Sequence, residues 1–104
     1  MPTQTALCAV NELAEGEMRG AVLADGRRIA LYNINGTIYA TDDTCTHELA
    51  SLSEDGCLDG EQVVCGWHFC SFNVPTGAAC NSPCIVPLKT YCVVVVDGAV
   101  HVEL

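Results

Sequence analysis

Two short boxes near the middle of the chain combine cysteine with histidine. They are Cys45-Thr46-His47 and Cys65-Gly66-Trp67-His68. Seventeen residues separate the boxes, so the pattern is C-x-H, then x17, then C-x-x-H. Cysteine sulfur and histidine nitrogen are ligands for zinc and for iron in proteins. If the boxes lie on neighbouring loops, the side chains of Cys45, His47, Cys65 and His68 can together hold one metal centre.

Two kinds of metal site use two cysteines and two histidines. One is a tetrahedral structural zinc ion, and the other is a [2Fe–2S] cluster of the Rieske type, in which two histidines replace two cysteines on one iron. Zinc sites usually place paired ligands two to four residues apart, so the single residue between Cys45 and His47 is tight for one ion. In a cluster, Cys45 and Cys65 would bind one iron while His47 and His68 bind the other. The spacing favours the cluster, and a zinc-stabilised binding module is the alternative.

Short strands and tight turns surround the boxes. Five dipeptides are typical of type I′ hairpin turns: Asp25-Gly26, Asn35-Gly36, Asp55-Gly56, Asp59-Gly60 and Asp97-Gly98. The predicted strands are 28–34, 37–41, 90–96 and 99–104, with weaker candidates at 5–10 and 18–24. Helical periodicity is nearly absent, with at most one turn at 11–17. The sequence therefore predicts an all-β fold, an antiparallel sandwich or small barrel.

The charge of the chain is strongly negative, because thirteen acidic residues stand against four basic ones, for a net charge of −9. Such a chain is an unlikely ligand for nucleic acid and suits a basic protein surface. The longest apolar run, 91–96, is far shorter than the roughly 18 residues of a membrane helix, and the first twenty residues lack a signal-peptide pattern. We therefore expect a soluble, cytoplasmic protein that binds no membrane.

The acidic residues are concentrated around the boxes, since no Lys or Arg occurs between Arg28 and Lys89. The acids of this span are Asp42, Asp43, Glu48, Glu54, Asp55, Asp59 and Glu61. Such a run is commonly just a solvated face. Its overlap with the boxes makes docking of a partner there an equal alternative, with Glu48 and Glu54 as the side chains to test.

The remaining cysteines are interpreted as structural side chains. Cys8, Cys57 and Cys92 lie among apolar strand residues and are predicted to be small buried hydrophobes. Cys80 and Cys84 form a C-x3-C pair, for which inert loop thiols are favoured over a disulfide or a second metal site. His101 alternates with two valines that face the core, so it is predicted to be a surface histidine and not a ligand.

With the two boxes, most of the chain resembles the Rieske-type ferredoxins of bacterial aromatic ring-hydroxylating dioxygenase systems. The stretches that carry the resemblance, besides the boxes, are Tyr39-Ala40-Thr41-Asp42-Asp43-Thr44, Asp55-Gly56-Cys57-Leu58-Asp59-Gly60, Phe72-Asn73-Val74-Pro75-Thr76-Gly77 and Leu88-Lys89-Thr90-Tyr91. The resemblance implies a single Rieske domain over 1–104, with a β base at 1–43 and 78–104. It places a small, loop-rich cluster-binding subdomain at about 44–77.

The resemblance also implies a function. The chain would carry one [2Fe–2S] cluster and pass single electrons from a flavoprotein ferredoxin reductase to a terminal Rieske non-haem iron oxygenase, without being an enzyme itself. A small Rieske-like subunit of another reductase, such as nitrite reductase, is a further alternative. Cys70 and Phe72 stand where high-potential relatives have hydroxyl donors to the cluster, so packing or a weak S–H contact is expected of Cys70. We therefore expect a reduction potential at the low end of the Rieske range, about −150 mV.

Overall fold

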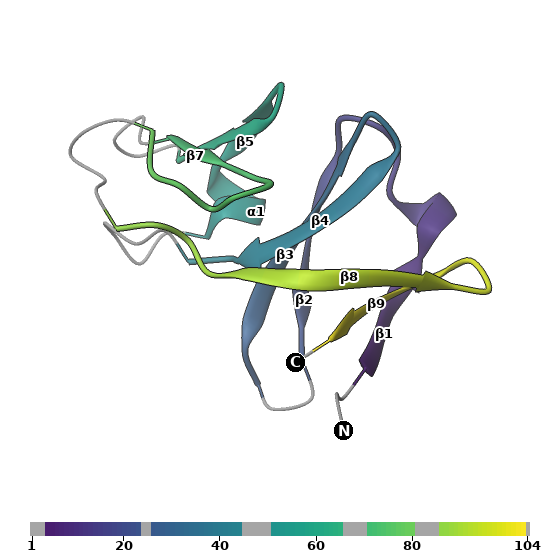
Figure 1. The fold of residues 1–104 in the computed structure, drawn as a ribbon. Coiled ribbons are helices and arrows are strands. Elements are labelled where there is room, and N and C mark those ends of the chain that lie inside the picture. The colour runs from purple at the N-terminus through teal and green to yellow at the C-terminus, as the bar shows by residue number, and fades with distance from the viewer. Residues whose placement is uncertain (1–3, 24–25, 45–50, 66–70, 81–85, 104) are drawn as a thin grey trace.

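The protein is described from a computed structural model, which covers residues 4–23, 26–44, 51–65, 71–80 and 86–103. Within these residues the chain forms nine strands, one short α-helix and one 3-10 turn (Figure 1). The strands are β1 (Gln4–Ala9), β2 (Met18–Val22), β3 (Arg28–Ile34), β4 (Thr37–Asp42), β5 (Cys57–Asp59), β6 (Gln62–Val64), β7 (Ser71–Asn73), β8 (Thr90–Val96) and β9 (Ala99–Glu103). The helix α1 is Leu52–Asp55, and the 3-10 turn is Val10–Glu12. In the part of the chain that is described, neither helical segment is long and apolar enough to cross a membrane.

The larger sheet has six strands in the order β1-β9-β8-β4-β3-β2, and every neighbouring pair is antiparallel. Its strands curl around a core that includes Ile29, Leu31, Val100 and Val102, all fully buried. The predicted all-β fold is confirmed, and the weaker strand candidates at the N-terminus are the strands β1 and β2. The predicted single turn near residue 11 is the 3-10 turn.

The smaller sheet has three antiparallel strands in the order β5-β6-β7. Its buried residues Val63 and Phe72 share a second core with Ala30 and Tyr32, which come from the opposite face of β3 to Ile29. Strand β3 is therefore covered on both faces, which explains its nearly continuous apolar sequence. In Figure 1 the small sheet and α1 lie together beside β3 and β4.

The turn chemistry is confirmed at two of the predicted hairpins. Both residues of Asn35-Gly36 and of Asp97-Gly98 have positive φ, as a type I′ turn requires. The β5–β6 turn is shifted by one residue, because Asp59 pairs with Gln62 and the loop consists of Gly60 and Glu61. Here Gly60, with φ +59°, takes the first loop position, which is the glycine position of a type II′ turn.

The prediction of a hairpin turn at Asp55-Gly56 is wrong. The dipeptide ends the helix α1, and Gly56 has φ −97°. Ser51 begins the helix by accepting a hydrogen bond from the backbone N–H of Glu54, and Leu52 is buried in the second core. A helix of only four residues is too short to show a helical repeat of apolar residues. Its formation depends instead on burial of Leu52 in the tertiary structure, which the sequence pattern does not show.

The predicted burial of three cysteines is also wrong. Cys57 and Cys92 are exposed and Cys8 is half-buried, and all three are free thiols. Cys57 opens an edge strand, and Cys92 lies next in sequence to Val93, which packs against the first core. Apolar neighbours along a strand thus do not decide burial, because successive side chains point to opposite faces. His101 does alternate with the buried valines but is half-buried, and its Nδ1 atom is covered.

Candidate metal centre

The structure describes one of the four predicted ligands. Cys45, His47 and His68 lie outside the described residues, whereas Cys65 directly follows strand β6 and is only 2% exposed. Cys65 belongs to the second core. Among the described residues, no three His, Cys, Asp or Glu side chains gather as a metal site would require.

Paired residues flank the segment 45–50, which contains most of the first box and the residues that follow it. Strand β4 ends at Asp42, and Thr44 and Ser51 then form an isolated antiparallel bridge on the two sides of residues 45–50. The backbone N–H of Leu52 also donates to the carbonyl oxygen of Asp43, at 2.7 Å. The two ends of this segment are therefore held together by backbone hydrogen bonds.

The segment that contains the second box is bounded in the same way. Strands β6 and β7 are antiparallel, and Val64 pairs with Ser71 on the two sides of residues 65–70. The two approaches lie close to each other, because Gly56 fits between them. A Cβ atom on Gly56 would lie 2.7 Å from the carbonyl oxygens of both Leu52 and Val64. Only glycine allows α1 and the end of β6 to come so near.

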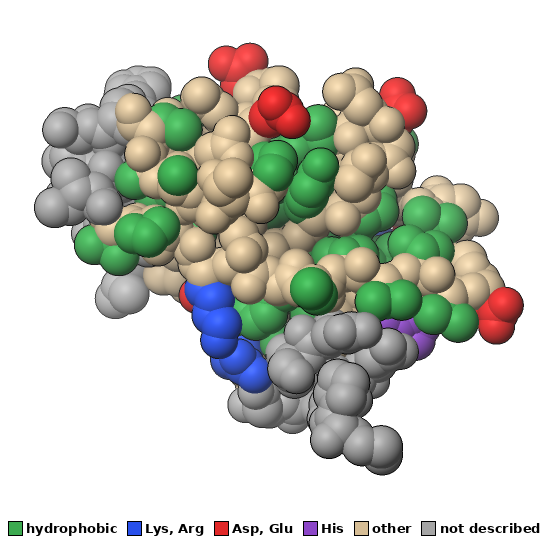
Figure 2. Space-filling view, in the orientation of Figure 1, with side chains coloured by type: hydrophobic (Ala, Val, Ile, Leu, Met, Phe, Trp, Pro, Cys, Tyr) green, Lys and Arg blue, Asp and Glu red, His purple; other side chains and the backbone are tan. Residues whose placement is uncertain are grey.

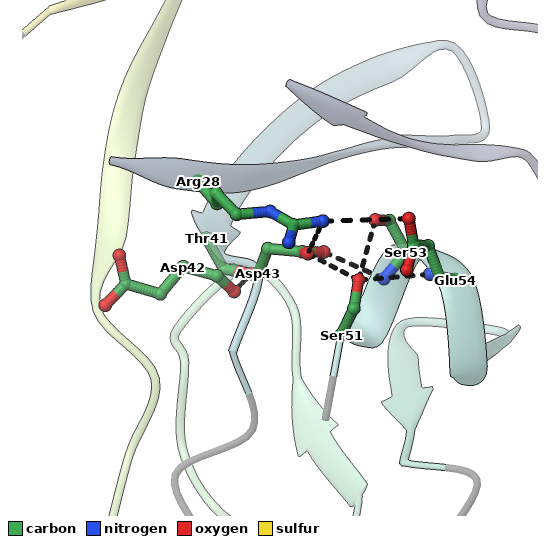
Figure 3. A network of polar contacts seen from close by, with 7 residues as sticks. All are labelled: Arg28, Thr41, Asp42, Asp43, Ser51, Ser53 and Glu54. Carbon is green, nitrogen blue, oxygen red and sulfur yellow. Dashed lines mark hydrogen bonds and ion pairs between the residues drawn. The ribbon is translucent and has the colours of Figure 1, made fainter. Parts of the chain in front are cut away.

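A polar network surrounds Asp43, two residues before the first box (Figure 3). The Asp43 carboxylate accepts hydrogen bonds from the Ser51 hydroxyl, at 2.5 Å, and from the backbone N–H of Ser53, at 2.8 Å. The Arg28 guanidinium lies 3.7 Å from the same carboxylate and also 3.7 Å from Glu54. Asp43 is only 1% exposed, so these partners compensate a buried charge.

The internal role of Asp43 corrects the sequence-based view of the acidic residues as one solvated face. Asp42 is half-buried and accepts a hydrogen bond from the Tyr91 hydroxyl. Glu54, Asp59 and Glu61 are exposed. No pattern in the sequence separates the two groups, because all of these acids lie in a segment without basic residues. At the end of β4 the backbone geometry determines where each acidic side chain lies, because the side chains of Asp42 and Asp43 point in different directions there (Figure 3).

Tyr91 connects the start of β8 to this end of β4. Burial of the phenol, reinforced by its hydrogen bond to Asp42, raises the pKa of Tyr91 to about 12. The Arg27 guanidinium and the Lys89 ammonium lie 5.8 and 5.3 Å from the centre of its ring. On the face drawn in Figure 2 the basic side chains form one group, whereas acidic side chains lie mainly along the upper and right edges.

The donor atoms of the two boxes fit a Rieske cluster. Two cysteine sulfurs and two histidine nitrogens are the set that such a cluster uses. Cys65, the donor that the structure describes, lies at the boundary between the second core and the second box, and its burial limits access of water from that side. A site of this kind can take up and release an electron.

Comparison with known proteins agrees with this donor set. The family model for the Rieske [2Fe-2S] domain matches residues 3–92. The chain is 48% identical over 98 residues to the ferredoxin component of the p-cumate 2,3-dioxygenase system of Pseudomonas putida, which covers 94% of this chain and 83% of that protein. Among solved structures, the Sphingomonas yanoikuyae B1 ferredoxin superposes with a TM-score of 0.92 at 37% identity, covering 98% of this chain and 99% of that one.

A second solved structure shows a related protein with a partner. It is a complex of reduced oxygenase and oxidized ferredoxin in carbazole 1,9a-dioxygenase. The matching chain has a TM-score of 0.90 and 41% identity, and the match covers 96% of this chain and 92% of that one. These matches extend over nearly the whole length and are far above the level at which only the fold would be shared. The chain therefore belongs to the Rieske [2Fe-2S] domain family, and its cofactor is one Rieske-type [2Fe–2S] cluster.

Proposed function

We propose that the chain is a one-electron carrier of an aromatic ring-hydroxylating dioxygenase system. It receives electrons from a flavoprotein ferredoxin reductase and delivers them to the terminal Rieske non-haem iron oxygenase, which performs the hydroxylation. The observation that carries the proposal is the 48% identity, over 94% of the chain, to the ferredoxin component of such a system. This observation favours a carrier over a zinc-stabilised module or a nitrite reductase subunit.

The proposed ligands are the two cysteines and two histidines of the boxes. Cys45 and Cys65 hold one iron, and His47 and His68 hold the other. When bound, a cluster of this kind takes up and releases one electron. The paired residues on either side of each box support this assignment, because they hold the two ends of each segment together. Gly56 also supports it, since its backbone lies close to the carbonyl oxygens of both Leu52 and Val64.

The proposed division of the domain follows the two sheets. The base comprises 1–43 and 78–104, and the cluster-binding subdomain about 44–77. In support, the strands of the larger sheet lie within residues 4–42 and 90–103, whereas the strands of the smaller sheet lie within residues 57–73. Two backbone hydrogen bonds lie near the proposed boundaries, one from the Leu52 N–H to the Asp43 carbonyl and one from the Leu88 N–H to the Gly77 carbonyl.

The proposed partners dock through electrostatic attraction, and the protein works in the cytoplasm. Acidic side chains favour a basic partner surface and a fast encounter. Glu54, Asp59 and Glu61 support this proposal, since they are exposed and lie on α1 and the β5–β6 turn, within the proposed subdomain. For the reduction potential, Phe72 offers no hydroxyl to a cluster sulfur, and fewer such hydrogen bonds favour a low value, about −150 mV.

The purified protein tests the cofactor and its ligands. We expect two iron atoms and two acid-labile sulfides per chain, as a [2Fe–2S] cluster requires, together with a red-brown colour that fades on reduction with dithionite. One zinc ion per chain and no labile sulfide would instead establish the zinc-stabilised module.

Reconstitution with partner proteins tests the electron-transfer role. The measurement is hydroxylation of an aromatic substrate in the presence of NADH, a flavoprotein reductase, this chain and a terminal oxygenase. We expect turnover to depend on this chain and to fall when salt screens the encounter. The proposed partner is wrong if no ring-hydroxylating oxygenase offered reoxidises the reduced protein, while an enzyme of another class does.

A further inference from the structure

The carboxylate of Asp43 has an unusual position for an acidic residue. It is 1% exposed, at the end of β4, and both of its oxygens accept a hydrogen bond from the segment that follows the first box. The donors are the Ser51 hydroxyl and the Ser53 backbone N–H. Burying a charged carboxylate is unfavourable unless hydrogen bonds compensate it, so this arrangement must be held by the surrounding fold.

These contacts close the first ligand segment from both ends. Asp43 precedes residues 45–50, and Ser51 and Ser53 follow them. The Thr44–Ser51 bridge and the hydrogen bond from Leu52 N–H to the Asp43 carbonyl connect the same two ends through the backbone. The side-chain contacts of Asp43 therefore add to these backbone contacts. We call the hydrogen bonds from the Ser51 hydroxyl and the Ser53 backbone N–H to the Asp43 carboxylate the Asp43 clasp.

The clasp is also connected to the approach of the second box. Ser51 accepts from the Glu54 N–H and so begins α1, whose Leu52 side chain packs in the same core as Cys65. On its other side, Arg28 of β3 lies 3.7 Å from the Asp43 carboxylate and anchors it to the larger sheet. Displacement of Asp43 would thus break contacts that connect the end of β4 to both the start of α1 and strand β3.

We propose that Asp43 is a positioning residue for the cluster: its carboxylate fixes the segment that carries Cys45 and His47 relative to Cys65. This inference rests on the proposed ligation by Cys45, His47, Cys65 and His68. Asp43 is not itself a ligand, and it acts through Ser51 and the Ser53 backbone. A chelator can take iron only after the ligands leave the metal, and contacts that hold the two ends of the ligand segment together oppose that local unfolding.

The test compares the holoprotein with two variants that break the clasp. Asp43→Asn removes the charge, and Ser51→Ala removes the hydroxyl while leaving every charge in place. A hydrogen bond to a charged group is strong enough that its loss should accelerate bleaching of the visible absorbance by an iron chelator about tenfold. The EPR g-values of the reduced cluster should shift in both variants. Ser51→Thr, which restores a hydroxyl, should return both readouts to wild type.

Two matched controls separate the clasp from general effects of charge and local structure. Asp42→Asn removes the same charge one residue earlier, but the Asp42 side chain points away from the clasp and accepts from Tyr91 (Figure 3). Thr76→Ala removes an exposed hydroxyl from the same proposed subdomain, and the partner of that hydroxyl, Asn73, lies outside the clasp. Both controls should bleach within about twofold of wild type. The double variant Asp43→Asn/Ser51→Ala should bleach no faster than the faster single variant, because the two changes remove one contact.

The outcomes distinguish this inference from the proposed function. A wild-type protein without a [2Fe–2S] cluster would overturn the proposed function and this inference with it. A wild-type cluster with unchanged bleaching and EPR spectra in Asp43→Asn and Ser51→Ala would overturn the inference alone, even if both variants melt at lower temperature. Equal acceleration by Asp42→Asn would also overturn it, since the effect would then be one of charge.

Discussion

At the scale of single residues, the end of β4 assigns different tasks to two neighbouring carboxylates. Asp43 points to Ser51 and Ser53, whereas Asp42 accepts a hydrogen bond from Tyr91 of β8. Side chains of consecutive strand residues face opposite ways, so the same Asp-Asp pair can connect to the ligand segment and to the larger sheet at once. The burial of the cysteines likewise depends on their position in the fold, since Cys65 is buried whereas Cys57 is exposed.

The hydrogen bond between Tyr91 and Asp42 predicts an alkaline transition. The pKa of Tyr91 is raised to about 12, so the neutral phenol stabilises the folded protein. This contribution is complete below the ordinary pKa of tyrosine, about 10, and is lost as the pH rises toward 12. In a titration of tyrosinate absorbance, we expect Tyr91→Phe to remove a step near pH 12. Asp42→Asn should move that step to lower pH, and a step unchanged in Asp42→Asn would contradict the assigned contact.

The cysteines allow a matched test of ligation. Cys65→Ser is expected to remove most of the cluster, because serine replaces a thiolate ligand at a buried position. Cys57→Ser and Cys92→Ser change the same atom at exposed positions and should keep the wild-type content of iron and labile sulfide. Iron and sulfide analysis of the purified variants measures the difference. A full cluster in Cys65→Ser would exclude Cys65 from the ligand set.

At the scale of elements, strand β3 connects the two cores of the molecule, and its neighbour β4 leads into the first box. Strand β3 contributes Ile29 and Leu31 to the core of the larger sheet and Ala30 and Tyr32 to the core beneath the small sheet. A strand covered on both faces is rigid, because side chains pack against it from both sides. The first box follows β4, which pairs with β3, and the second box follows β6, whose Val63 packs in the core beneath the small sheet. Backbone hydrogen bonds close their ends, and glycines allow the elements to approach closely.

Gly77 offers a test of such a close approach. It has φ +79°, and a Cβ atom there would lie 2.2 Å from the carbonyl oxygen of Leu88, whose N–H donates to the Gly77 carbonyl. Gly77→Ala should lower the free energy of unfolding by about 3 kcal/mol, because backbone strain and overpacking add. Gly16→Ala is the matched control, since Gly16 has φ +82° with open space around it. It should cost about 1 kcal/mol. Thermal unfolding followed by circular dichroism measures both, and equal losses would show that Leu88 yields to the added methyl group.

At the scale of the whole molecule, the net charge of −9 governs encounters with partners. The charge is not a uniform coat, because Asp42 and Asp43 are used internally, and Arg27 and Lys89 lie together against Tyr91. We therefore expect a basic partner to be attracted to the molecule as a whole, and we propose that the exposed acids nearest the boxes orient it.

Glu54 tests the orientation of the partner. Its side chain is 70% exposed and lies on α1, so the ion pair with Arg28 contributes little to stability. Glu54→Gln should lower the rate of electron transfer to the oxygenase about two- to threefold at low salt, with the difference vanishing at high salt. Asp97→Asn removes one charge from the β8–β9 turn, which lies far from the small sheet (Figure 1), and should leave the rate unchanged. Equal rates for all three proteins would remove Glu54 from the docking surface.

The sequence by itself predicted the donor set of the boxes, and it determined two of the turns that frame the larger sheet. Both are local features: ligand type and spacing are read directly, and Asn35-Gly36 and Asp97-Gly98 carry the positive φ of their turns within two residues. Only the tertiary structure decided that Asp43 is buried, that α1 replaces a turn at Asp55-Gly56, and that Cys57 and Cys92 are exposed. These properties depend on which segments meet across β3 and α1, and contacts between segments distant along the chain leave no periodic mark in the sequence.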